Sequence, residues 1–243
     1  MFTKTFVIVC FILSSNSIKR KKLGELMKMN LQLDQIAPLS CNKCRRLVTY
    51  LNETKEKQPS WFNAPVPSFG SINSEILIIG LAPGLRGANR TGRPFTGDFA
   101  GEILYQTLWV HGFANELYNA DGNDRLVLNN IRITNAVRCV PPKNKPIGSE
   151  INNCRSFLSF EIDSMSRLRV ILCLGRIAHD TLIRHFKLPS KSHGFAHCKE
   201  HIIRPNLSLL NSYHCSRYNI NTGRLTNEMF NNVFIKLQQI IKN

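Results

Sequence analysis

A short apolar segment followed directly by a glycine-rich loop is the feature that most constrains how this chain can fold. Residues 75–79 (Glu-Ile-Leu-Ile-Ile) predict a buried parallel strand, residues 80–98 a loop, and residues 100–109 the helix that follows it. In open α/β sheets, ligands bind beside loops that leave the carboxyl ends of strands. The segment therefore predicts an α/β fold with a binding site next to this loop.

The loop has the composition of an anion-binding segment that contains one acid. Its five glycines allow the backbone to approach a ligand closely, and Arg86, Arg90 and Arg93 add positive charge that suits phosphate or an anionic leaving group. Asp98 is the only acidic residue of the loop. From the residues alone, Asp98 is either a structural ion-pair partner of these arginines or a catalytic carboxylate.

Strand-like and helix-like segments alternate along the rest of the chain. Strands are predicted at residues 75–79, 131–137, 170–174 and 209–213. This alternation predicts a three-layer α/β/α sandwich around a central, mostly parallel, four-stranded sheet. The predicted helices are residues 100–110, 150–165, 177–186 and 228–241, the last capped by Thr226.

A strong positive charge distinguishes the chain from an ordinary globular protein. Its 243 residues suit one α/β domain, and its formal net charge is +16. Residues 1–28 hold six basic residues and one acidic residue, so most of the excess lies in the remainder of the chain. The charge favours a partner with a phosphate backbone; a generally basic proteome or a need for solubility is the alternative.

The first residues have the pattern of a leader rather than of a folded segment. Residues 6–13 form an apolar run too short to span a bilayer as a helix, and the basic run at residues 19–22 lies on the wrong side of it for export. We therefore expect residues 1–39 to be a leader or extension, with Met27 or Met29 as alternative starts, and residues 40–243 to form the domain. The position of the basic run and the lack of an Ala-x-Ala cleavage site favour a cytoplasmic location, and no later segment predicts a transmembrane helix.

The eight cysteines do not have the pattern of a disulfide framework, because the chain is long enough to be stabilised by an apolar core. Two residues separate Cys41 from Cys44, and fourteen separate Cys139 from Cys154. Four cysteines suit either a four-iron cluster or a structural zinc ion, and their spacing does not distinguish the two. Cys173 lies in a predicted apolar strand and is expected to be a core residue.

Four segments match, in order, the motifs of one enzyme family. They are residues 61–70 (WFNAPVPSFG), 80–98 (GLAPGLRGANRTGRPFTGD), 134–146 (TNAVRCVPPKNKP) and 212–226 (SYHCSRYNINTGRLT). In these motifs the chain resembles the family-5, or b-type, uracil-DNA glycosylases of the iron-sulfur uracil-DNA glycosylase superfamily. The resemblance implies a monofunctional DNA repair glycosylase that flips uracil out of DNA and hydrolyses its N-glycosidic bond to leave an abasic site.

The same resemblance implies roles for individual residues. Asp98 corresponds to the carboxylate that positions water or stabilises the cationic sugar, and His214 corresponds to the donor to the departing base. Phe95 corresponds to the aromatic residue that stacks on the flipped base, and Asn135 to the side chain that recognises uracil. The other expected substrate-binding residues are Gly80 and Ala82, and the expected DNA-binding residues are Arg86, Arg90, Arg93, Arg217 and Arg224.

The resemblance also assigns a cofactor to the cysteines. Family-5 enzymes carry a four-iron, four-sulfur (4Fe-4S) cluster on cysteines arranged in this way, which implies that Cys41, Cys44, Cys139 and Cys154 are its ligands here.

Two positions depart from related patterns. Leu81 stands where the family-4 relatives carry a carboxylate, which moves the expected catalytic role to Asp98. Cys215 replaces the proline usual after the catalytic histidine, which removes a fixed φ and predicts a softer loop over residues 215–226. This loop is expected to enter the minor groove and hold the flipped state.

Two alternatives to this assignment stay open. One keeps the fold but changes the base to hypoxanthine, xanthine or an etheno adduct. The other is a non-catalytic, basic α/β module that binds nucleic acid and carries a structural metal. That module leaves unexplained why Asp98, Asn135 and His214 are placed together at the ends of three predicted strands. We predict a monomer whose partner is DNA that contains uracil or other deaminated bases, and we predict no membrane partner.

Overall fold

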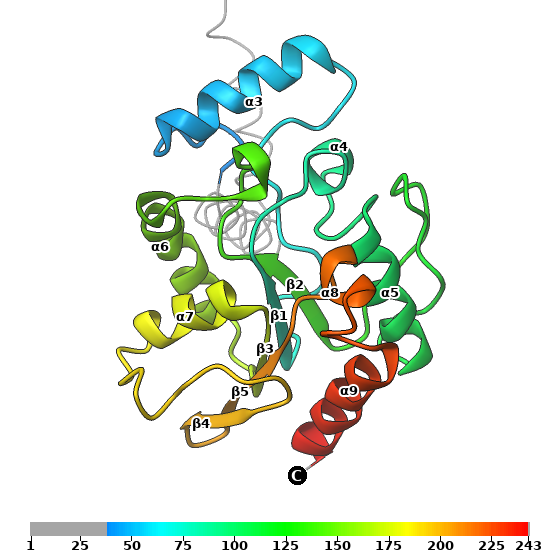
Figure 1. Ribbon diagram of the computed structural model, residues 1–243, viewed down its shortest axis with the longest axis vertical. Helices are drawn as coiled ribbons and strands as arrows, with labels where there is room; N and C mark the ends of the chain where they lie inside the picture. The colour runs from blue at the N-terminus through cyan, green and yellow to red at the C-terminus, as the bar shows by residue number, and fades with distance from the viewer. Residues whose placement is uncertain (1–37, 243) are drawn as a thin grey trace, which may run out of the picture.

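A five-stranded sheet forms the centre of the protein, whose computed structural model describes residues 38–242 (Figure 1). The order across the sheet is β2-β1-β3-β5-β4; the first four strands are parallel, and β4 pairs antiparallel with β5 at one edge. The prediction of a mostly parallel sheet is confirmed, but the sheet has five strands rather than four. The strands are β1 (Ile76–Gly80), β2 (Ile131–Asn135), β3 (Val170–Leu174), β4 (Glu200–Arg204) and β5 (Leu207–Ser212).

The sequence pattern misses β4 because this strand is short, polar at both ends and placed at the sheet edge. Its Ile202 is exposed, and its register with β5 shifts between Ile202 and Arg204. Edge strands of this kind show weak alternation, so periodicity does not detect them.

Seven α-helices and one short 3-10 turn complete the described part of the chain. The four predicted helices are present within two residues of their predicted ends, whereas periodicity does not predict α3, α4 or α8. The Thr226 hydroxyl accepts from the N–H of Met229 at 3.1 Å, which confirms its predicted capping role. The helices are α3 (Arg45–Lys57), α4 (Ala88–Thr91), α5 (Phe99–Val110), α6 (Gly148–Ser164), α7 (Arg176–His185), α8 (Arg217–Asn221) and α9 (Asn227–Lys242).

Helices cover both faces of the sheet, which confirms the three-layer arrangement (Figure 1). On one face α5 and α9 pack against alternate strand residues such as Ile78 and Leu172. On the other face α6 and α7 pack against the intervening residues, such as Ile79 and Cys173. Because successive side chains of a strand point to opposite faces, a continuous apolar run is buried on both. Cys173 is a core residue, as predicted.

A buried ion network ties α6 to β2. Glu161 of α6 is fully buried and accepts from Arg132 Nε at 2.5 Å, from the Thr134 hydroxyl at 3.1 Å and from Arg138 Nη2. Burial alone would raise the pKa of Glu161, but the two guanidinium groups outweigh it and hold this pKa below its usual range. The network therefore fixes the strand segment on both sides of Asn135.

A third apolar cluster joins α3 to α6 and to the segment after β2, and it contains Leu47, Val137 and Phe157. The domain boundary expected near residue 40 falls close to the start of the described residues, and the predicted leader, Met27 and Met29 lie outside them. Among residues 38–242, no helix has the length and hydropathy needed to cross a membrane.

Candidate active site

A cavity of about 390 Å³ opens at the carboxyl ends of the central strands. Its walls come from the loop after β1, from the end of β2 and from the segment after β5. The sequence-predicted residues Ala82, Phe95, Asp98, Asn135 and His214 all line it. The position matches the expectation for a ligand site in an open α/β sheet.

Gly80 allows the floor of this cavity to close tightly. It ends β1, directly beside Asn135 in the β2 register. A Cβ atom on Gly80 would lie 2.5 Å from Asn135 Oδ1 and 2.5 Å from Phe95 Cζ, so a larger residue would displace both side chains. No described residue makes a side-chain hydrogen bond to Asn135, which leaves its amide available to a ligand.

The two oxygens of Asp98 have different environments. Oδ1 accepts from the N–H of Gly101 at 3.0 Å and thereby caps α5. Oδ2 faces the loop, where a Cβ atom on Gly87 would lie 2.5 Å from it. This second oxygen is therefore confined by the backbone of the loop, and the Asp98 residue lines the cavity.

The described residues show no ion pair at Asp98, because Arg90 and Arg93 of the loop are engaged elsewhere and Arg86 is exposed. Arg93 forms a two-point ion pair with Asp124, at 2.6 and 2.7 Å, and this pair lowers the pKa of Asp124 to about 2. Arg90 donates to the backbone oxygens of Arg86 and Ala120. Among the described residues, no salt bridge reaches Asp98.

His214 lies immediately beyond β5, with its ring stacked on Phe95 at a centroid separation of 5.9 Å and an interplanar angle of 26°. Burial lowers the pKa of His214, and the Asp98 carboxylate only partly opposes this effect. The imidazole is therefore neutral at neutral pH. Its Nδ1 is buried and has no hydrogen-bond partner among residues 38–242, as expected for an atom whose partner is a ligand.

Hydrogen bonds and packing hold the loop after His214 in place. Ser216 caps α8 by accepting from the N–H of Asn219, and the Asn219 side chain donates to the His214 carbonyl at 2.8 Å. Cys215 is fully buried, with Sγ 3.4 Å from the Ala100 carbonyl. The side chain that replaces the expected proline thus packs into the core behind the histidine.

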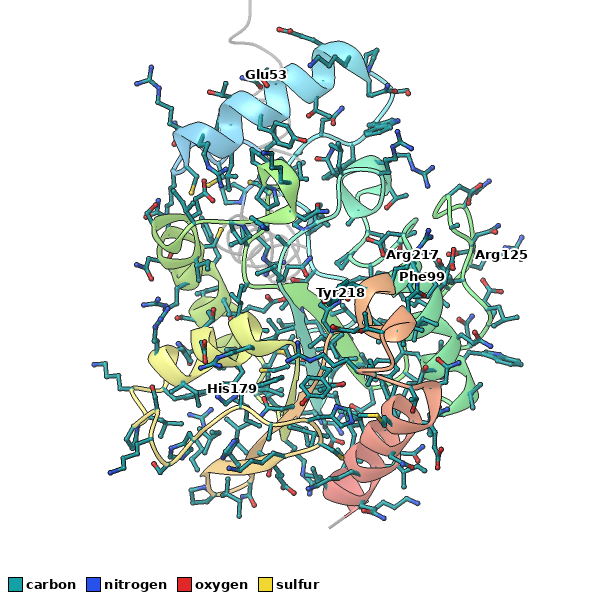
Figure 2. All side chains as sticks on the ribbon, viewed as in Figure 1. Glu53, Phe99, Arg125, His179, Arg217 and Tyr218 are labelled. Atoms are coloured by element: carbon teal, nitrogen blue, oxygen red, sulfur yellow. The ribbon has the colours of Figure 1, made fainter. Side chains whose placement is uncertain are left out.

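The outer surface of this loop carries basic and aromatic side chains beside the cavity (Figure 2). Arg217 lies over the Phe99 ring at 5.1 Å, and Tyr218, next to it on α8, is 72% exposed. Arg224 lies over the Tyr213 ring at 4.8 Å. Among the arginines expected to bind DNA, only Arg93 forms an ion pair, with Asp124. Its guanidinium therefore stabilises the fold.

The four cysteines of the expected metal site belong to one packed cluster of side chains. Burial raises the pKa of the Cys139 thiol, and the nearby thiols of Cys154, Cys41 and Cys44 raise it further. Asn153 approaches Cys44 Sγ with its side-chain amide at 3.5 Å. Within residues 38–242, no three His, Cys, Asp or Glu side chains are grouped closely enough to hold one metal ion.

Comparison with known proteins identifies the family. The model of the uracil DNA glycosylase superfamily matches residues 67–238. A type-5 uracil-DNA glycosylase of Thermus thermophilus is 41% identical over 207 residues, which cover 83% of this chain and 94% of that protein. The chain belongs to the type-5 uracil-DNA glycosylases. Other type-5 uracil-DNA glycosylases agree: that of Pyrobaculum aerophilum is 37% identical over 84% of its length and 78% of this chain, and that of Mycobacterium leprae 38% identical over 93% and 87%.

The superfamily match covers the whole sheet and the cavity. Cys41 and Cys44 precede residue 67 and lie outside the match. The resemblance noted from the motifs is therefore confirmed at the level of the family. The sequence did not reveal several residues that hold the loops beside the cavity in place. Asp124 is 31 residues from Arg93, so no local pattern joins them, whereas the spacing of Ser216 and Asn219 is a recognisable helix-cap signal.

Proposed function

We propose that the protein is a DNA repair enzyme that turns uracil out of DNA and hydrolyses its bond to deoxyribose, leaving an abasic site. The observation that carries this proposal is the convergence of Asp98, Asn135 and His214 on one cavity from three separate segments. These residues supply three groups suited to this reaction: a side-chain amide that can recognise the base, a carboxylate and an imidazole. Membership in the type-5 family supports the same conclusion.

Recognition of uracil is assigned to Asn135 and Phe95. With its oxygen toward N3–H and its NH2 group toward a carbonyl oxygen, the Asn135 side chain complements uracil, whereas cytosine would require the opposite orientation of the amide. Phe95 supplies an aromatic face on which the base stacks. Phe95 has a φ of 55°, which is uncommon for an aromatic residue and is consistent with a backbone held in place for function.

Bond cleavage is assigned to His214 and Asp98. As the glycosidic bond breaks, negative charge grows on uracil and positive charge on the sugar. The neutral His214 imidazole donates an N–H to the departing base, and Asp98 Oδ2 orients water and stabilises the cationic sugar. The proton removed from the water leaves with the uracil or passes to solvent, and the hydroxyl becomes bonded to the sugar.

The first experiment measures strand breaks after alkali treatment of uracil-containing duplex DNA. Asp98→Asn keeps an oxygen that can cap α5 but removes the charge, so we expect the single-turnover rate to fall by about a hundredfold to a thousandfold. Asp163→Asn, at an exposed position of α6, is the control. A nearly normal rate in Asp98→Asn would make Asp98 a helix cap only. A wild-type protein that binds DNA but produces no breaks would be the non-catalytic module.

A panel of single-lesion duplexes tests the preferred base. We expect uracil to be removed fastest and Asn135→Ala to lose discrimination among bases together with rate. Faster removal of hypoxanthine, xanthine or an etheno adduct would replace uracil with that substrate.

We further propose that Cys41, Cys44, Cys139 and Cys154 hold a 4Fe-4S cluster. The thiols of Cys41, Cys44 and Cys154 lie close enough to Cys139 to raise its pKa, so one group could bridge all four. Four cysteines suit either a four-iron cluster or zinc, and membership in the type-5 family supports the cluster. When bound, the cluster would serve as a structural staple between α3, α6 and the segment after β2. Purified protein should contain iron and acid-labile sulfide; stoichiometric zinc without iron in anaerobic preparations would contradict the assignment.

A further inference from the structure

A second cavity, of about 680 Å³, lies on the other side of the loop that carries Asp98. Its walls are α3, the segment that contains Trp61, and the residues around α4. Gly97 lines this groove while its neighbour Asp98 lines the proposed active site, so one stretch of loop separates the two. Figure 1 shows α3 and α4 at the same end of the molecule.

The groove combines aromatic surface with positive charge. Tyr50 and Trp61 line it and are partly exposed. Neither ring takes part in any aromatic or cation–π pair among the described residues. The charged residues that line the groove are Lys57, Arg86, Arg90 and one acid, Glu53, which is labelled on α3 in Figure 2.

The walls are fixed to each other by hydrogen bonds. The N–H groups of Phe62 and Asn63 donate to the carbonyl oxygens of Arg90 and Asn89, each at 3.1 Å. The Asn63 side chain accepts from Asn89 Nδ2 at 2.9 Å and donates to the Gln58 carbonyl at 2.8 Å. Trp61 is therefore held beside Arg90 in a preformed groove.

We propose that this groove binds an unpaired nucleotide of single-stranded DNA close to the lesion. Its aromatic faces can stack on a base only when that base is free of a duplex, and its cations can contact the neighbouring phosphates. This inference rests on the proposed function, because that function brings DNA to the adjacent cavity. It adds a second contact with DNA, to an unpaired nucleotide outside the cavity that would receive the uracil.

The decisive experiment uses Trp61 as its own reporter. The chain has two tryptophans, and Trp109 lies on α5 outside the groove, so Trp109→Phe leaves Trp61 as the only tryptophan. Titration with uracil-free oligothymidylate should quench its fluorescence, and a blunt duplex that contains the same strand should not. Absence of quenching at saturating single strand, or equal quenching by both, would overturn the proposal.

Binding measurements on variants complete the test. Loss of one base stack weakens binding by about five- to a hundredfold. We expect Trp61→Leu to weaken binding of a labelled oligothymidylate by this factor more than it weakens binding of duplex DNA. Trp61→Phe keeps an aromatic ring and should restore most of the lost affinity. Lys55→Ala is the control, since it removes an exposed cation of α3 that does not line the groove. Equal weakening on both DNAs, or none on single strand, would contradict stacking at Trp61.

Failure of this proposal is distinguishable from failure of the proposed function. Uracil excision from duplex by the wild-type protein tests the function, whereas quenching by uracil-free DNA requires no chemistry.

Discussion

At the scale of single residues, Asp98 combines a structural and a proposed chemical role through separate atoms. Oδ1 caps α5, so the position of the carboxylate is set by the helix. Oδ2 is confined by the backbone of the loop, and the Asp98 residue lines the cavity. A helix cap thus fixes a carboxylate where the proposed reaction needs it, which explains why the loop ends in Asp98 directly before α5.

The confinement of Oδ2 predicts the effect of enlarging Gly87. The Cβ atom of Gly87→Ala would lie 2.5 Å from Oδ2 and push the carboxylate aside. Because small displacements of a reacting group are costly, we expect the single-turnover rate to fall by about a hundredfold with thermal stability largely retained. Gly148→Ala, where a Cβ atom meets nothing within 4 Å, is the control. If the two variants cleave uracil at equal rates, displacement of the Asp98 carboxylate does not limit the reaction.

The partly buried imidazole of His214 predicts the pH dependence of the reaction. Because burial holds its pKa below the ordinary value of about 6.5, His214 stays neutral on acidification through that pH. We expect the His214-dependent change in single-turnover rate to have its midpoint below about pH 6.5, and His214→Ala to lack this change. A rate midpoint above that value would contradict a neutral imidazole.

The same pKa shift affects stability. The unfolded chain binds the His214 proton at higher pH than the folded chain, so the free energy of unfolding should decrease as pH falls through about 6.5.

At the scale of elements, α8 presents Tyr218 to solvent beside the cavity. A flipped nucleotide leaves a gap in the base stack, and filling it with an aromatic side chain would offset part of the unstacking cost of a few kcal/mol. We therefore expect Tyr218→Ala to slow excision of paired uracil more than excision of single-stranded uracil. Ile202→Ala, an equally exposed apolar change on β4, is the control. Equal slowing on both substrates would argue against a role in flipping.

The junction of β2 and α6 depends on Glu161. Glu161→Gln leaves Arg132 and Arg138 buried without a counter-charge, which should lower the free energy of unfolding by about 3–5 kcal/mol. Thermal and denaturant unfolding measure this, with the exposed Asp163→Asn on the same helix expected to change stability by less than about 0.5 kcal/mol. A small effect of Glu161→Gln would mean that the arginines find other partners.

At the scale of the whole molecule, the net charge of +16 predicts salt-sensitive binding. Each phosphate contact releases counterions, so the logarithm of the binding constant should fall linearly with the logarithm of salt concentration. Arg217→Ala should reduce this slope by about one, and Arg93→Ala should not, because Arg93 is paired with Asp124. Salt-insensitive binding would make the charge incidental.

The sequence by itself determined the family, the layered architecture and the composition of the cavity. Apolar runs such as residues 170–174 predict strands because burial on both sheet faces leaves a local pattern. Parallel strands also align their carboxyl ends, so residues that follow them, such as Asn135, are brought to one edge.

Only the tertiary structure decided which groups pair and which surfaces face each other. Arg93 is matched to Asp124 rather than Asp98, β4 is added at the edge, and α3 is laid beside α4 to form the groove at Trp61. These contacts join segments that are distant along the chain. They depend on packing and on the competition among several possible partners, and this leaves no signal in local periodicity.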